Sequence, residues 1–255
     1  MSHIDFFRPW AAMLAAILVA GLLVGANLAT GANAQELTLA GETVVLDPGH
    51  GGSDWGAVNG TYKIKEKDQN LAVAYRLKTL LKASGATVYM TRGGDPNNPM
   101  ERIKKDDGDD AFPDDATLSN NDRYTYANST GADILVSIHM NGSSNPDTDY
   151  TTTLFGKWQK DKALAYAIFG DLEANPPYGL VTLPAANGEG TIDRRQPYLF
   201  ASGVLLKSDM PATIAETVFI TNNAEAALLS DGTGSRQQQI AEALGTGIEN
   251  YLSTH

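Results

Sequence analysis

The chain has 255 residues, 42 % of them apolar, which is enough for one sizeable hydrophobic core and a short extra segment. It contains no cysteine, so disulfides, cysteine-ligated zinc clusters and thiol nucleophiles are excluded, and any transition-metal site must use His, Asp and Glu. A formal net charge of −11 argues against nucleic-acid binding, because neutralising phosphates requires clustered Lys and Arg. The same charge provides no attraction to anionic membranes or wall polymers.

Residues 1–34 are typical of an export signal. A long apolar run follows Arg8, and Ala32-Asn33-Ala34 supplies a small-x-small cleavage site. We therefore expect an exported protein that is extracellular, periplasmic or associated with the cell wall. The alternative is an uncleaved anchor, because an apolar run of about 19 residues approaches the length of a bilayer span.

Residues 44–57 (VVLDPGHGGSDWGA) join a short apolar strand to a glycine-rich loop. The apolar run at 44–46 is typical of a buried strand, and the Pro and Gly residues after it end the strand. His50 is therefore expected at the carboxyl end of a strand, where open α/β sheets bind ligands. A metal ligand and an ordinary loop histidine are both compatible with this position.

The next segments predict a strand, a helix and a strand in succession. Apolar residues recur at three- and four-residue intervals over Lys67–Ser84, Gly85 ends this helix, and Ala86–Thr91 is typical of a second strand. Such an order indicates a parallel pair of strands joined by a crossover helix. Glu66 stands at the entrance of the helix, where an acid complements the helix dipole or serves as a ligand.

A short helix is predicted over Asp122–Asn128, followed by a buried strand over Asp133–Ile138. This strand ends at a second histidine, His139. The two remaining histidines lie near the chain termini. His50 and His139 are therefore the candidate imidazole ligands.

The C-terminal half predicts two longer helices around two strands. A helix is expected over Lys157–Ala174, a short strand over Val204–Leu206, a buried strand over Ala212–Ala215 and an amphipathic closing helix over 240–252. Glu216 follows the buried strand, where an acid is costly unless it is paired or bound to a metal. Together these elements predict a single α/β domain over 35–255, with a twisted, mostly parallel sheet flanked by helices on both faces.

Two polar segments interrupt this pattern. Residues 96–117 form an acidic stretch that we interpret as a surface insertion, because it lacks the ordered acids of a calcium loop. Residues 175–203 are rich in Gly and Pro and carry aromatic and basic side chains, which suit the rim of a pocket or a loop without function. One regulatory hypothesis is that either segment covers a cleft until a partner protein moves it.

Six segments carry a resemblance to a known family. They are VVLDPGHGG at 44–52, EKDQNLAVA at 66–74, TVYMTR at 87–92, DRYTYAN at 122–128, ADILVSIHMN at 132–141 and MPATIAETVFITN at 210–222. In this order they span nearly all of the expected mature chain, and they resemble the catalytic domain of zinc-dependent N-acetylmuramoyl-L-alanine amidases of the amidase-3 group. Val218 departs from the pattern, since the family usually has Gly there, and the acidic stretch is longer than usual.

The resemblance implies a function and a set of site residues. His50, Glu66 and His139 would hold one Zn²⁺ per chain, and Glu216 would be the catalytic acid-base. The implied reaction is hydrolysis of the peptidoglycan amide between N-acetylmuramic acid and L-alanine by zinc-activated water. The alternatives are a zinc peptidase that acts on another wall amide and a non-catalytic wall-binding or regulatory module of the same fold.

Several polar residues have two interpretations. Asp47, Asn70 and Asn141 either orient metal ligands or form turns. Arg92 and Arg123 either brace the sheet, which we favour, or meet the substrate. Arg194 and Arg195 either meet stem-peptide carboxylates or lie in solvent, which is favoured. We expect a monomer whose substrate is peptidoglycan and which has a regulatory or targeting protein as a further partner.

Overall fold

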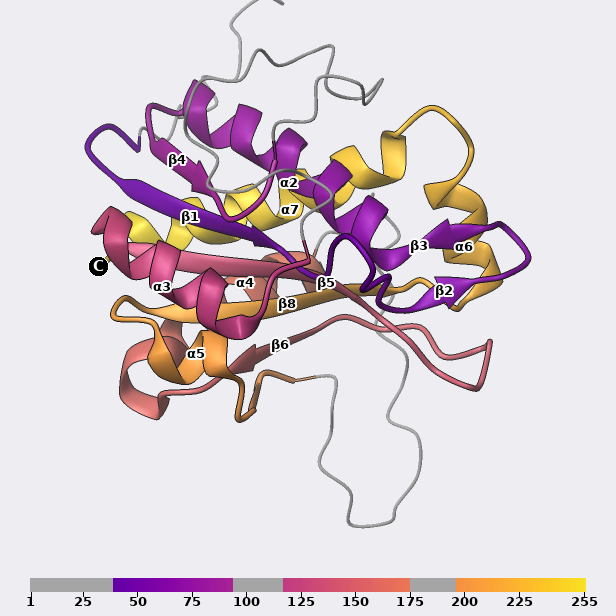
Figure 1. The fold of residues 1–255 in the computed structure, drawn as a ribbon. Helices are drawn as coiled ribbons and strands as arrows, with labels where there is room; N and C mark the ends of the chain where they lie inside the picture. The colour runs from indigo at the N-terminus through magenta and orange to yellow at the C-terminus, as the bar shows by residue number, and fades with distance from the viewer. Residues whose placement is uncertain (1–38, 94–116, 175–195) are drawn as a thin grey trace, which may run out of the picture. The chain divides into compact units, whose positions relative to one another are not determined.

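The computed structural model describes residues 39–93, 117–174 and 196–255 (Figure 1). The expected export signal, nearly all of the acidic insertion, and Arg194 and Arg195 lie outside these ranges. Among the residues that are described, no helix is both long and apolar enough to cross a membrane.

A six-stranded sheet forms the centre of the fold. The strand order is β4 (Thr87–Met90), β1 (Thr43–Pro48), β5 (Ile134–Asn141), β8 (Ala212–Phe219), β6 (Thr152–Phe155) and β7 (Tyr198–Leu199). Every neighbouring pair is parallel except β6 and β8, which are antiparallel. The prediction of a mostly parallel sheet is confirmed.

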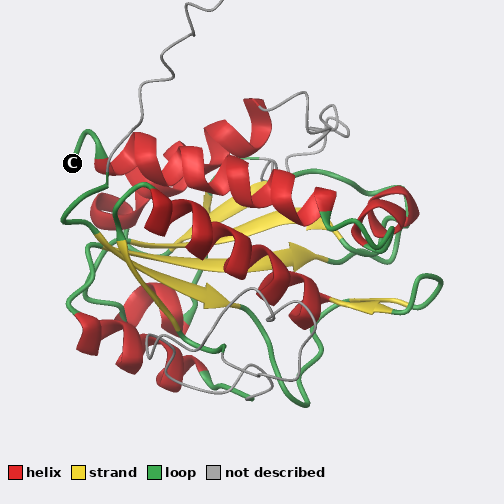
Figure 2. Cartoon of the chain, turned by 90° about the horizontal axis from the view of Figure 1, so that it is seen from above, coloured by secondary structure: helices red, strands yellow, loops and turns green. Residues whose placement is uncertain are grey.

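Helices cover both faces of this sheet (Figures 1 and 2). Successive side chains of β1 point to opposite faces of the sheet, and both faces are apolar. Val44 and Leu46 pack in one hydrophobic cluster, and Val45 packs in the other. The first cluster is completed by α2 (Glu66–Ala83), α4 (Trp158–Ala174) and α7 (Ser235–Leu252), and the second by α3 (Asn120–Thr130) and α5 (Gly203–Lys207). A strand buried on both faces needs the uninterrupted apolar run that its sequence contains.

The predicted helices have local reasons to begin and end where they do. At the start of α3, Ser119 and Asp122 form a reciprocal capping box, and Gly131 ends the helix with a left-handed φ of 67°. Two acids, Glu66 and Asp68, lie in the first turn of α2, where they complement the helix dipole.

One predicted element is wrong, and two strands are longer than expected. Residues 204–206 lie in the helix α5 rather than in a strand, because an apolar run of three residues has no period that separates the two structures. Strand β5 continues beyond His139 to Asn141, and β8 continues beyond Glu216 to Phe219. His139 and Glu216 therefore lie inside their strands, near the carboxyl ends, rather than after the strands.

Five small elements were not predicted. These are the strands β6 and β7, the hairpin of β2 (Val58–Asn59) and β3 (Ile64–Lys65), and the helix α6 (Asn223–Leu229). The sequence of β6 is TTLF, whose β-branched residues favour a strand without showing an apolar alternation. Asn222 caps α6 by accepting hydrogen bonds from the backbone N–H groups of Ala224 and Glu225.

Candidate metal centre

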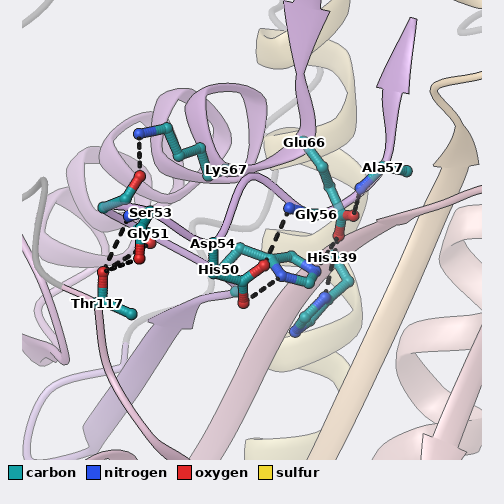
Figure 3. Close-up of polar contacts among 12 residues, drawn as sticks. His50, Gly51, Ser53, Asp54, Gly56, Ala57, Glu66, Lys67, Thr117 and His139 are labelled. Carbon is teal, nitrogen blue, oxygen red and sulfur yellow. Dashed lines mark hydrogen bonds and ion pairs between the residues drawn. The ribbon is translucent and has the colours of Figure 1, made fainter.

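Four candidate side chains meet near the carboxyl ends of the central strands. His50 follows β1, Glu66 is the first residue of α2, and His139 lies in β5. Glu216 in β8 is directly opposite His139 in the parallel register. Figure 3 shows the side chains of His50, Glu66 and His139 converging. The structure thus brings together residues that are up to 166 positions apart in sequence, from His50 to Glu216 (216 − 50 = 166).

The distances in this group fit one metal ion. Glu66 Oε1 lies 3.2 Å from His50 Nε2 and 3.0 Å from His139 Nδ1, and the three ligand atoms are all within 4.8 Å of one another. Four donors arranged tetrahedrally around zinc at bonds of about 2.0–2.2 Å would be about 3.4 Å apart. The two imidazole rings meet edge to face, with centroids 4.9 Å apart, so neither ring blocks the other.

Glu66 is buried and held in one orientation. Its Oε2 accepts from the backbone N–H of Ala57 at 2.8 Å, and its Oε1 accepts from the N–H of Met140 at 3.1 Å and from Asn70 Nδ2 at 3.2 Å. Burial alone would raise the pKa of Glu66, but hydrogen bonds from His139 and His50 hold that pKa far below its usual value. The side chain is therefore a fixed, anionic candidate ligand.

Asp54 orients His50 from the other side. Its Oδ2 lies 2.9 Å from His50 Nδ1, and its Oδ1 accepts from the backbone N–H of Gly56 at 3.2 Å. Burial would lower the pKa of His50, yet Glu66 and Asp54 raise it to about 9, so the site favours a positive charge between these acids. The sequence interpretation missed Asp54; its four-residue spacing from His50 in a glycine-rich loop was the available signal.

Two arginines brace the loop that carries His50, as favoured from the sequence. Arg92 donates to the carbonyl oxygens of Pro48 at 3.0 Å and Gly49 at 3.1 Å, and Arg123 donates to those of Pro48 at 3.0 Å and His50 at 2.8 Å. His50 has a φ of 62°, which is a left-handed conformation that L-residues with a side chain seldom adopt. The guanidinium contacts stabilise this backbone.

Asp47 supports the brace rather than the ligands. Its carboxylate is fully buried and accepts hydrogen bonds at 2.6 Å from Arg123 Nη1, Thr91 Oγ1 and Ser137 Oγ. Burial alone would raise the pKa of Asp47, but the Arg123 charge and these hydrogen bonds lower it. Among the other residues with two interpretations, Asn70 contacts a candidate ligand, whereas Asn141 Oδ1 accepts from the backbone N–H of Gly142 at the end of β5.

Two glycines leave room for the ligands. A Cβ on Gly49 would lie 2.2 Å from the His139 ring, and one on Gly56 would lie 2.4 Å from Glu66 Oε2. Gly56 also has a φ of 64°, which favours glycine. The glycine-rich loop therefore permits the close approach of His139 and Glu66.

A cleft of 520 Å³ opens over this group. Its lining includes His50, His139 and Glu216 together with two aromatic side chains, Tyr198 and Phe200. Burial raises the pKa of Glu216 above its usual value, although the neighbouring His139 lowers it. A carboxyl group shifted in this direction exchanges a proton more readily at neutral pH.

Known proteins share this sequence and fold. The sequence model of a family described as N-acetylmuramoyl-L-alanine amidase matches residues 44–250. The germination-specific N-acetylmuramoyl-L-alanine amidase of Bacillus subtilis is 29 % identical over 218 residues, which cover 85 % of this chain and 82 % of that protein. The Escherichia coli amidase AmiA is 29 % identical over 245 residues, which cover 82 % of this chain and 75 % of that protein.

Solved structures agree with this match. The catalytic domain of CwlV, an N-acetylmuramoyl-L-alanine amidase from Bacillus (Paenibacillus) polymyxa, superposes with a TM-score of 0.64 at 27 % identity, covering 84 % of this chain and 99 % of that one. The CwlD amidase of Clostridioides difficile, solved in complex with the GerS lipoprotein, gives a TM-score of 0.63 at 28 % identity and covers 84 % of this chain and 100 % of that one.

Proposed function

We propose, from the premise that this chain belongs to the N-acetylmuramoyl-L-alanine amidase family, that it hydrolyses the amide between N-acetylmuramic acid and L-alanine in peptidoglycan at a zinc site. The ligands are His50, Glu66 and His139, and Glu216 is the acid-base. The observation that carries this proposal is the convergence of the three ligand atoms with Glu216 opposite His139 across two neighbouring strands.

The donor set suits zinc and leaves room for chemistry. Two neutral imidazoles and one carboxylate are a ligand set of catalytic zinc sites, which keep one coordination position open. When bound, zinc lowers the pKa of a coordinated water to about 7 and polarises the carbonyl of the scissile amide. The carboxylate of Asp54 on His50 Nδ1 fixes the ring so that Nε2 faces the ion.

Glu216 addresses the two obstacles to amide hydrolysis. Water is a weak nucleophile, so the Glu216 carboxylate takes a proton from the water that attacks the lactyl carbonyl carbon. The amine is a poor leaving group, so the protonated Glu216 returns that proton to the L-alanine nitrogen as the C–N bond breaks. The raised pKa of Glu216 makes its carboxylate a stronger base for the first transfer.

Digestion of purified peptidoglycan tests this proposal. Zinc-loaded protein should release intact stem peptides and leave lactyl-muramic acid ends, identified by mass spectrometry. Glu216→Gln should reduce the rate by about 10²–10⁴, which is the usual contribution of a general acid-base. Glu42→Gln, a change of a partly buried acid in the segment before β1, is the matched control and should keep the parent rate.

Two outcomes would contradict the proposal. Cuts within the stem peptide would indicate the zinc peptidase. Protein that holds no zinc and gains no activity when zinc is added would indicate the binding or regulatory module.

The setting of the reaction follows from the proposed substrate. Peptidoglycan lies outside the cytoplasmic membrane, so we infer that residues 1–34 direct export. A regulatory partner is a further proposal, supported by the CwlD amidase that was solved with the GerS lipoprotein. Expression with and without residues 1–34, followed by fractionation, tests the first inference, and retention of the full-length protein inside the cell would contradict it.

A further inference from the structure

The hairpin formed by β2 and β3 presents an aromatic and cationic surface that the mechanism leaves unused. The Trp55 side chain is 49 % exposed, and Lys65 Nζ lies 3.8 Å from the centroid of its ring. Val58 is 40 % exposed and is the cross-strand partner of Lys65. We call Trp55, Val58 and Lys65 the hairpin platform.

The platform adjoins the metal centre. Trp55 directly follows Asp54, which contacts His50, and Lys65 directly precedes the ligand Glu66. The backbone N–H of Glu66 donates to the carbonyl oxygen of Ala57 at 2.9 Å, which ties the hairpin to the start of α2. Figure 2 shows the hairpin projecting beyond the central strands, at the end to which their arrows point. The platform is therefore joined to the metal centre through Asp54 and Glu66.

The platform carries a cation that is available to a ligand. Arg123, which lines the cleft, is engaged with Asp47 and with loop carbonyls. Lys65 makes no ion pair with any residue in the described ranges, and the cation–π contact holds its ammonium over the Trp55 face. The platform can thus accept an anionic group that carries an aliphatic portion.

We propose that the hairpin platform binds the stem peptide of the substrate, with Lys65 paired to a free stem carboxylate and the Trp55 ring packed against the aliphatic part of the peptide. This inference rests on the proposed function and adds a determinant of substrate choice to it. Because Lys65 is positioned over Trp55 before substrate arrives, less conformational entropy is lost on binding.

The test compares two soluble disaccharide peptides that differ only in whether the stem carboxylates are free or amidated. The parent should prefer the free acid by about threefold to fivefold in kcat/KM, the size expected of an exposed ion pair, and the difference should lie in KM. Lys65→Met should abolish the preference by raising KM for the free acid to the value for the amidated substrate. Lys63→Met removes the same charge from the turn of the hairpin and should keep the preference. Trp55→Ala should raise KM for both substrates.

The outcomes separate this inference from the proposed function. A parent that cleaves both substrates equally well, or a Lys65→Met variant that keeps the preference, overturns the inference alone. If Trp55→Ala raises KM but Lys65→Met leaves the preference for the free acid unchanged, the platform stacks against a sugar ring, and the inference about the stem carboxylate is overturned. A parent that cleaves neither substrate overturns the proposed function and this inference with it.

Discussion

At the scale of single residues, hydrogen bonds to neighbouring groups hold two of the candidate ligands, Glu66 and His50, in place. Glu66 and His50 are each held by further hydrogen bonds, from Asn70 and backbone amides in the first case and to Asp54 in the second. Such contacts fix the direction of the donor atoms before a metal arrives. Metal affinity should therefore depend on side chains that do not touch the ion.

Asp54→Ala should weaken zinc binding about 10- to 100-fold, because the His50 ring loses the acceptor that fixes its Nδ1–H. Competition with a chromophoric chelator measures this affinity without reference to activity. Ser53→Ala is the matched control, since Ser53 contacts Thr117 rather than a ligand. Equal zinc affinity in Asp54→Ala and the parent would show that Asp54 has no such role.

At the scale of elements, the ends of β1 and β5 are joined by a buried charge network around Asp47. Its partner Arg123 reaches from α3 to the carbonyl oxygens of the loop after β1. Helix α3 therefore stabilises the strained loop after β1, and its main contribution is to hold the backbone of His50 in its left-handed conformation.

Arg123→Met should lower the free energy of unfolding by about 3–5 kcal/mol, because the buried Asp47 carboxylate would lose its countercharge. Urea denaturation measures this change. The double variant Asp47→Asn with Arg123→Met should recover part of the loss, since it removes the uncompensated charge. Arg76→Met, which alters a half-buried arginine on α2, is the control, and a loss of similar size there would contradict the argument.

The segment before β6 supplies a pH-dependent contribution to stability. Burial and the nearby Glu225 raise the pKa of Asp149 from 3.8 to about 7. Between these values the folded state binds more protons than the unfolded state, so this group makes the protein less stable as pH rises from about 4 to 7. The contribution is constant above pH 7.

Asp149→Asn should therefore stabilise the protein at pH 7.5 by about 1 kcal/mol, after allowance for solvent screening, and should have no such effect at pH 4. Denaturant titration at the two pH values measures the difference. Asp147→Asn, an exposed neighbour, should be neutral at both. A gain for Asp149→Asn that is the same at both pH values would rule out the titration of this group as its cause.

Sequence patterns predicted β1 and β5 because burial on both faces requires an uninterrupted apolar run, and α2 because burial on one face imposes a helical period. They failed for α5 and β6, where three or four residues carry no distinct period. Candidate ligands were found from their positions at strand ends and from motif resemblance. The contacts of Arg123 were not, since a hydrogen bond between distant segments leaves no local pattern. Asp54 was missed although it lies only four residues from His50.

At the scale of the whole molecule, the candidate metal centre connects three parts of the fold: the loop after β1, the start of α2 and the strand β5. The unfolded chain has no such preformed group. Zinc should therefore bind the folded state in preference, and its binding free energy should add to stability.

Zinc at 100 times its dissociation constant should raise the free energy of unfolding by about 2.7 kcal/mol, and excess chelator should reverse the gain. Thermal unfolding with and without zinc measures the shift. His139→Ala should abolish it, whereas a shift of full size in that variant would indicate that zinc binds elsewhere.

Anomalous diffraction from zinc-loaded crystals, recorded on both sides of the zinc absorption edge, tests the central claim most directly. We expect one peak per chain, about 2.0–2.2 Å from His50 Nε2, His139 Nδ1 and a carboxylate oxygen of Glu66, with Glu216 facing the open position. A zinc-free site in zinc-replete crystals, or an ion held by other side chains, would contradict the account.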